Sequence, residues 1–433
     1  ALGFALIILI GSLLLMLPCS VREGVTVHYI DALYTSTSAV CVTGLIAIDV
    51  GDTFTPLGQF FLGMLIQIGG LGVTSVGAGV ILMIGKKINL KGRSLIREAS
   101  NLDSGKGIVR FLKSVLFTTF LFELIGAVLS FIVFAQDYPF WHALGISLFH
   151  SVAAFNNSGF DILGNYQNLI PYQSDILLNL VTCALIFFGG IGFFVIRELW
   201  AKRCRWSKLS MHAKVVLSVS LILIVVGTLL LKLTEDVTWL GAFFQSVSAR
   251  TAGFSTYPLG KFSNAGLLVM TVLMFIGASA GSTGGGFKVS RIVIGFKSVL
   301  AYLGAFLHPR VVRKVKFEDK DVDGETMRAI SAYFTAAIGV FTISVLLVAL
   351  DGFDLVTTFS AVAATFNNVG AGLGVAGPTS NFAAFIDFSK VVMTMDMLLG
   401  RLEVFPMLML FYPPLWKESI GEARIRRNRS PFH

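Results

Sequence analysis

The sequence predicts an all-α polytopic membrane protein: four consecutive helix–pore-loop–helix repeats around a central pore, with eight transmembrane helices and four re-entrant half-helices. Two features of composition predict the class. Hydrophobic residues make up 55% of the chain and charged residues only 14%, whereas soluble domains carry about 25% charge. The repeat is predicted by a third observation, because a polar loop with one glycine follows a short apolar stretch four times.

Long apolar stretches supply the spanning helices. Residues 176–196 and 329–350 contain no charge, and each exceeds or matches the about 20 residues that one spanning helix needs. Further candidates are 111–135, 215–231, 264–287 and 391–413. The opening "ALGFALIILIGSLLLML" is expected to be a truncated first helix rather than a signal peptide, because no basic leader precedes it.

The net charge of +9 follows the predicted topology rather than a nucleic-acid surface. Most Lys and Arg residues fall in four blocks, 86–113, 197–214, 288–328 and 401–433. The intervening connections carry acids such as Asp137, Asp161 and Asp351. Because basic loops stay in the cytoplasm, we expect the four blocks and the C-terminus to be cytoplasmic in a multi-pass plasma-membrane protein. No nucleic-acid partner is expected, and the four cysteines give no sign of a disulfide framework.

The four predicted units are 1–85, 108–200, 211–300 and 328–416, followed by a basic cytoplasmic tail, 417–433. Their short apolar helices are expected near 30–41, 142–155, 237–249 and 353–366, too short to span and therefore re-entrant. The loops that follow contain the candidate ion-binding residues Val42, Thr43, Gly44, Asn157, Ser158, Gly159, Thr251, Ala252, Gly253, Asn368, Val369 and Gly370.

Four such loops can surround one axis and present backbone carbonyls to a dehydrated monovalent cation. Glycine permits backbone angles that turn successive carbonyls towards the axis, and the C-terminal end of each half-helix adds negative partial charge. Only Asp161 follows a loop closely, so a carboxylate ring for divalent ions is not supported. Four ordinary extracellular turns are the alternative.

The pattern resembles the superfamily of K⁺ transporters that includes TrkH, KtrB and the plant HKT proteins. "TSTSAVCVTGL" at 35–45 and "GRLEVFP" at 400–406 are close to the KtrB form, and "GASAGSTGGGFKVSR" at 277–291 also fits. The resemblance covers essentially the whole chain and implies a K⁺-conducting subunit, not an enzyme. In that superfamily a serine in place of the first filter glycine accompanies Na⁺ preference, so glycine at all four positions favours K⁺.

The resemblance also implies partners. Members of the KtrB type form a homodimer and dock on a cytosolic ring of RCK subunits of the KtrA type, which bind ATP or ADP. The basic blocks are candidate docking sites for this ring, or hold anionic headgroups of membrane lipids. No organic cofactor is expected on this chain, and coupling to Na⁺ stays open.

A third-unit stretch of small residues predicts a broken helix in the membrane, because glycine weakens a helix by up to about 1 kcal/mol per residue. Its residues are Gly277, Ala278, Ser279, Ala280, Gly281, Ser282, Thr283, Gly284, Gly285 and Gly286. A phosphate-binding loop is excluded, because Phe287 interrupts the required Gly-Lys pair. The resemblance implies a gating loop below the filter, and close helix packing is the alternative. Packing is favoured for the glycines at 69–72 and 189–192.

Charges inside the membrane need a partner or a function. The resemblance places Arg401 near the pore, where it would repel cations and help the gating loop to close. A structural ion pair with an acid elsewhere is the alternative, since Glu403 does not share a helix face with Arg401. Asp396 lies in the same stretch.

Three other polar residues are interpreted as structural. Glu123 is expected to be a buried partner, Arg250 to brace the third loop from behind, and His150 to form a hydrogen bond within a half-helix. Competing functions are a secondary carrier of another solute and a Na⁺-selective member of the same superfamily. A membrane enzyme lacks a metal-ligand or nucleophile pattern in this sequence.

Overall fold

The computed structural model describes residues 2–72, 75–77, 108–307, 315–317, 320–370, 372, 382–402 and 404–410. These residues are mostly helical, with one antiparallel pair of two-residue strands, β1 (Lys316–Phe317) and β2 (Lys320–Asp321). The tail 417–433, Glu403 and most of the first basic block lie outside the described residues.

The helices of the first half are α1 (Leu2–Leu15), α2 (Tyr29–Val40), α3 (Val50–Thr53), α4 (Pro56–Leu71), α7 (Ile108–Phe134), α8 (Phe140–Phe155), α9 (Ile176–Ile191) and α10 (Phe193–Ala201). Those of the second half are α11 (Met211–Thr234), α12 (Trp239–Ser248), α13 (Asn264–Phe275), α14 (Val289–Leu307), α15 (Gly324–Val348), α16 (Leu355–Asn367), α17 (Asp387–Leu402) and α18 (Val404–Leu410). Single 3₁₀ turns occur at Ile170–Tyr172, Trp206–Lys208, Leu259–Lys261, Ala349–Asp351 and Phe382–Ala384.

Several helices begin where a capping side chain is available. Thr55 caps α4, whose first residue is Pro56, and Asp175 caps α9 by accepting a hydrogen bond from the Leu178 N–H at 2.7 Å. Asp354 caps α16, and hydrogen bonds from Thr357 hold the pKa of its carboxyl below the usual value. Such caps satisfy backbone N–H groups that have no partner inside the helix.

Four helices of the described chain are long and apolar enough to cross a membrane. They are Val109–Phe134, Met211–Thr234, Val289–Leu307 and Gly324–Asp351. The pair α9 and α10 adds a fifth if it counts as one span, although it bends by 99°. The expectation of eight spanning helices is therefore not met by length within the described residues, because α1, α4 and α17 have only 14, 16 and 16 residues.

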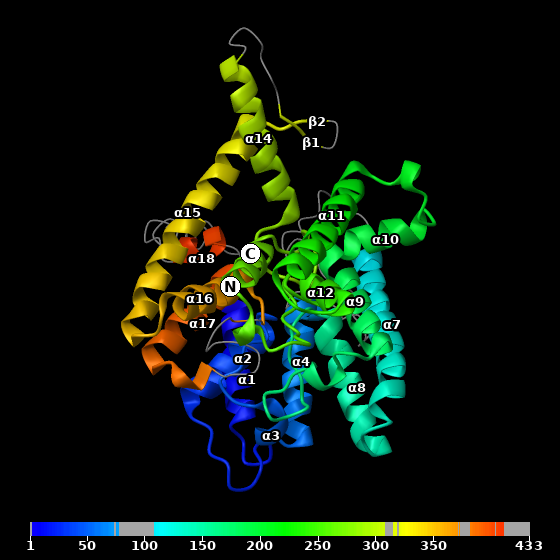
Figure 1. The fold of residues 1–433 in the computed structure, drawn as a ribbon, viewed down its shortest axis with the longest axis vertical. Coiled ribbons are helices and arrows are strands. Elements are labelled where there is room, and N and C mark those ends of the chain that lie inside the picture. Colours follow the sequence, from blue (N-terminus) through cyan, green and yellow to red (C-terminus); the bar gives the residue numbers. More distant parts are fainter. Residues whose placement is uncertain are drawn as a thin grey trace, which may run out of the picture.

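The helices close into a ring. The largest packing contacts are α7 with α8, α11 with α12, α1 with α2 and α16 with α17. Further contacts join α4 to α8, α9 to α12, α13 to α16, and α17 back to α2 near the start of the chain. In Figure 1, α7, α8 and α9 lie on one side and α15, α16 and α17 on the other, while α14 and α15 rise together away from the body.

Polarity is reversed relative to a soluble protein. Along α7, Leu124, Val128 and Ile132 are exposed, whereas Glu123 and Ser130 are buried. An apolar exterior suits hydrocarbon, and polar groups then need partners inside the protein.

Candidate functional site

The four candidate loops each begin directly after a short helix. Residues 42–44 follow α2, 157–159 follow α8, 251–253 follow α12, and 368–370 follow α16. The helix boundaries agree with the sequence expectation to within about two residues at every end, which is the usual uncertainty of helix assignment. All twelve loop residues are buried except Gly44, which is partly buried.

The structure brings the four loop glycines together. A side chain at Gly44 would overlap the backbone carbonyl of Ser158, and one at Gly159 would overlap the carbonyl of Ala252. A side chain at Gly253 would overlap the backbone of Gly370. The circle is completed by Gly370, where an added Cβ would lie 2.9 Å from the Thr43 oxygen and 3.2 Å from the Gly44 Cα. Four segments far apart in sequence thus meet in chain order around one point.

Each half-helix ends in a left-handed residue two positions before its glycine. These residues are Val42, Asn157, Thr251 and Asn368, with φ between 53° and 68°. In three of the loops the next N–H bonds the carbonyl five residues back, as in Thr43 to Ser38 at 2.7 Å, a Schellman-type helix end. Asparagine tolerates this conformation better than other residues with a side chain. The repeated Asn-Asn of the second and fourth loops therefore has a backbone cause that sequence reasoning missed.

A polar contact links the last loop to the first. The Asn368 amide donates to the Thr43 hydroxyl at 3.0 Å and to the Met397 carbonyl of α17 at 2.9 Å. A second link lies outside the loops, where the Phe382 N–H bonds the Ile46 carbonyl at 2.9 Å. The first and fourth units are thereby joined by two separate hydrogen bonds, one inside the loops and one outside them.

The predicted break in the third unit is present. α13 ends at Phe275 and α14 begins at Val289. Between them the chain folds back on itself, with hydrogen bonds from the Gly277 N–H to Phe287 and from the Ala278 N–H to Gly285. We call residues 277–286 the intramembrane loop.

The intramembrane loop is attached to the broken end of α9. The N–H groups of Ser279 and Thr283 bond the carbonyls of Gly190 and Gly189 at 3.0 and 3.2 Å, and the Phe193 N–H bonds Gly281 at 3.0 Å. The packing interpretation of the glycines at 189–192 is therefore incomplete. They end the helix, with Gly192 at φ 92°, and free two carbonyls to accept hydrogen bonds from the loop.

Arg401 lies between the intramembrane loop and α4. Its guanidinium donates to the carbonyls of Thr283 and Gly284, the latter at 3.2 Å, and to those of Gly69 and Gly70 at 2.6 and 3.1 Å. These described partners are backbone carbonyls, and no acid is among them. The glycines at 69–72 therefore also end a helix and present carbonyls, in addition to packing closely against Val40.

Glu123 supports the second loop from behind. Its carboxylate accepts a hydrogen bond from the Asn156 amide at 3.1 Å, and the same amide donates to Gln67 of α4 at 2.9 Å. Asn156 precedes the loop and is fully buried. The expectation of a buried structural partner is confirmed.

The structural interpretation of His150 is confirmed, whereas the described side-chain contacts of Arg250 are with α11 and the intramembrane loop rather than with the third loop. Arg250 donates to Ser220 of α11 and, at 3.4 Å, to the carbonyl of Gly277 at the start of the intramembrane loop. His150 of α8 is within hydrogen-bond distance of the Thr182 hydroxyl at 2.8 Å. Asp396 is buried and accepts a hydrogen bond from Ser344 at 2.6 Å.

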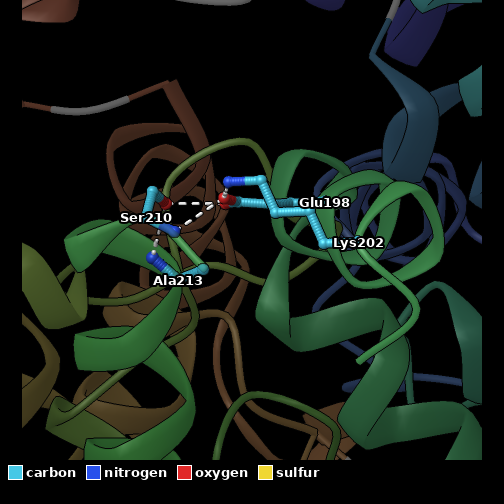
Figure 2. A network of polar contacts seen from close by, with 4 residues as sticks. All are labelled: Glu198, Lys202, Ser210 and Ala213. Atoms are coloured by element: carbon cyan, nitrogen blue, oxygen red, sulfur yellow. Dashed lines mark hydrogen bonds and ion pairs between the residues drawn. The ribbon is translucent and has the colours of Figure 1, made fainter. Parts of the chain in front are cut away.

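The connection between the second and third units is held by polar contacts around Glu198 (Figure 2). Its carboxylate accepts hydrogen bonds from the Ser210 N–H and hydroxyl, each at 2.6 Å, and pairs with Lys202. Ser210 in turn caps α11 through the Ala213 N–H at 3.2 Å. These contacts within the basic block 197–214 fix the end of α10 to the start of α11.

The fold and the central circle of glycines define a membrane protein with an interior polar site built from four loops. Residues 5–418 match the TrkH family of cation transport proteins, and the chain belongs to this family.

Individual relatives agree. The chain is 33% identical to the Ktr system potassium uptake protein B of Vibrio alginolyticus over 420 residues, covering 93% of this chain and 88% of that protein. It is 37% identical to the potassium/sodium uptake protein NtpJ of Enterococcus hirae over 305 residues, 68% of this chain and 67% of that protein. The crystal structure of the potassium transporter TrkH from Vibrio parahaemolyticus superimposes with a TM-score of 0.75 at 25% identity, covering 96% of this chain and 85% of that one.

Proposed function

We propose that this chain translocates K⁺ across the plasma membrane through a selectivity filter made of backbone carbonyls from the four loops. The observation that carries the proposal is the mutual contact of Gly44, Gly159, Gly253 and Gly370. The names of the Ktr and TrkH relatives, a potassium uptake protein and a potassium transporter, support K⁺ as the ion.

Carbonyl oxygens suit a monovalent cation because they replace its hydration shell without adding a full negative charge. The C-terminal ends of α2, α8, α12 and α16 lie next to the loops and add negative partial charge there. We assign each of the four units, 1–85, 108–200, 211–300 and 328–416, one outer helix, one half-helix with its loop, and one second helix, which is broken in the third unit. Together these make eight passages.

We assign the gate to the intramembrane loop. Hydrogen bonds to Gly189 and Gly190 on one side and to Arg401 on the other hold it in place. Arg401 also brings a positive charge to the path of a cation, so this arrangement is the closed form. Opening requires the loop to leave these partners.

Regulation would come from the cytoplasm. A homodimer docked on a nucleotide-binding RCK ring of the KtrA type fits the relationship to the Ktr proteins, with the basic segment 197–214 as one docking surface. The positions of the cytoplasmic loops and of the C-terminus follow from the charge pattern. Within the same proposal, coupling of K⁺ uptake to Na⁺ is a separate property that an uptake measurement has to determine.

The filter is tested by Rb⁺ and Na⁺ uptake into proteoliposomes with the Gly370→Ser variant. This position tolerates a side chain best, because an added Cβ would meet no atom closer than 2.9 Å and Gly370 has no left-handed φ. Gly339→Ser is the matched control, since nothing lies within 4 Å of a Cβ there. The proposal predicts a lower Rb⁺/Na⁺ ratio for Gly370→Ser alone, and an unchanged ratio would refute it.

A second candidate is Na⁺ transport through the same path. The name of NtpJ includes sodium, which is the observation that favours it. Wild-type vesicles that take up Na⁺ in preference to Rb⁺ would select this alternative.

A further inference from the structure

Asn168 lies in the connection between α8 and α9, nine residues beyond Gly159 and outside all four loop motifs. It is only 5% exposed. Its φ of 49° is in the left-handed region, which asparagine adopts more readily than other residues with a side chain but which persists only where the surroundings hold it. A buried polar side chain needs hydrogen-bond partners, and the contacts of Asn168 show which partners it has.

The Asn168 side chain joins the outer ends of the second and third loops. Its oxygen accepts from the N–H of Ser255 at 3.0 Å, two residues after Gly253. Its nitrogen donates to the carboxylate of Asp161 at 3.0 Å, two residues after Gly159, and approaches the Gly159 carbonyl at 3.5 Å. One amide group thus contacts the chain beyond both glycines.

A backbone bond runs beside this amide. The N–H of Leu169 donates to the carbonyl of Ser255 at 3.1 Å and also to the Asn168 oxygen at 2.9 Å. Residues 168–169 therefore engage both backbone groups of Ser255. The connection between α8 and α9 is therefore fixed to the third loop at these residues and is not a loose surface turn.

Ser255, the partner of residues 168–169 beyond the third loop, is itself held by hydrogen bonds. The Ser255 hydroxyl donates to the Tyr257 carbonyl at 2.6 Å and accepts from Gln245 of α12 at 2.9 Å. Ser248 of the same helix donates to the Phe254 carbonyl at 2.5 Å. A change at Asn168 is therefore transmitted to the spacing of the two loops and is not absorbed by a mobile partner.

We propose that Asn168 is a positioning residue that fixes the separation of the second and third loops and thereby the ion selectivity of the filter. This rests on the filter proposed above. Neighbouring glycines of the two loops already touch, because a side chain at Gly159 would overlap the Ala252 carbonyl. The selectivity of a site that replaces the water shell of an ion depends on the number and electric field of its oxygens. Loops that were free to separate would therefore discriminate less between K⁺ and Na⁺.

The test compares Asn168→Asp and Asn168→Gly with Asn165→Asp in the full-length protein. Asp keeps the acceptor for Ser255 and tolerates the left-handed backbone but loses both N–H donors, whereas Gly removes the side chain without backbone strain. Asn165 lies in the same connection, is also left-handed at φ 55° and is exposed. Its one described hydrogen bond uses the backbone N–H, which Asp retains.

The measurement is the ratio of initial Rb⁺ to Na⁺ uptake in proteoliposomes. Both Asn168 variants should lower this ratio by about two- to tenfold, the range expected for losing one net hydrogen bond, while Asn165→Asp keeps it. A merely structural residue would lower the yield or the total uptake without changing the ratio. Folded Asn168 variants with the wild-type ratio, or failure of both variants to fold, would overturn the proposal.

Gly370→Ser separates this result from a failure of the filter itself. If Gly370→Ser changes the ratio and the Asn168 variants do not, only the role of Asn168 is wrong. If Gly370→Ser leaves the ratio unchanged, the filter proposal fails and the proposal for Asn168 fails with it.

Discussion

Arg401 and Gly284 are separated by 117 positions in the chain and joined by a hydrogen bond of 3.2 Å from guanidinium to carbonyl. Through this bond the last long helix reaches the intramembrane loop of the third unit. The same guanidinium also binds Gly70 at 3.1 Å, so three units meet at one side chain.

The first prediction concerns the geometry of this side chain. Arg401→Lys keeps the charge but replaces a planar fork of five donors by a single ammonium group, which cannot serve four carbonyls on two sides in the same way. We expect basal Rb⁺ uptake to rise several-fold in Arg401→Lys and further in Arg401→Ala.

Arg22→Lys is the matched control. Arg22 also binds backbone carbonyls, those of Gly51 and Phe54, but lies in the connection before α2. Uptake by this variant should equal that of the wild type. A wild-type rate in Arg401→Lys would show that charge alone matters at this position.

The second prediction concerns the attachment of the intramembrane loop to α9. Phe193 is the first residue of α10, where proline fits a helix. Phe193→Pro removes the N–H that bonds Gly281, and Phe193→Ala removes only the ring. Losing about 1 kcal/mol of closed-state stability should raise basal uptake about fivefold in the proline variant relative to the alanine variant. Equal uptake by the two variants would argue against the attachment as part of the gate.

The third prediction concerns the ion pair that joins the first unit to the last. Lys390 of α17 is 5% exposed and lies 2.7 Å from Asp31 of α2. Lys390→Met alone leaves the Asp31 carboxylate without this partner and should destabilise the protein by about 3 kcal/mol. The Asp31→Asn/Lys390→Met double variant should recover most of this loss. Thermal unfolding in detergent measures both, and a double variant no more stable than Lys390→Met would contradict the prediction.

The fourth prediction concerns the acceptor behind the second loop. Glu123→Gln retains an oxygen for the Asn156 amide, so its uptake and selectivity should stay near wild type. Glu123→Ala removes that oxygen, and we expect a loss of about 1–3 kcal/mol in stability. Ser130→Ala, which removes from the same helix a buried hydroxyl without a described hydrogen-bond partner, controls for the loss of a buried polar atom alone. Equal instability of the Gln and Ala variants would indicate that the charge of Glu123 is essential.

The sequence was most informative where local chemistry decides the structure. Apolar length and flanking polar residues located the half-helices that end at Val40, Phe155, Ser248 and Asn367. The small residues at 277–286 located a break in the third unit, because weak helix propensity acts over a few neighbouring residues. These features needed no knowledge of distant parts of the chain.

Features set by tertiary contacts were not predictable. The left-handed backbone at Val42 has no signal in its side chain, since a β-branched residue disfavours it. The carbonyls of Gly189 and Gly190 accept hydrogen bonds from Thr283 and Ser279 only because the intramembrane loop lies beside them. Asn168 looked like an ordinary residue of a polar connection until the structure placed it against Ser255.

The circle of four glycines comes from a single polypeptide, and this has an evolutionary consequence. In an assembly of four identical subunits every substitution appears four times around the axis, so small adjustments are unavailable. Here one codon alters one quarter of the circle, and each quarter already differs in its neighbouring residues. Under the filter function proposed above, preference among alkali ions can therefore drift in small steps, one loop at a time.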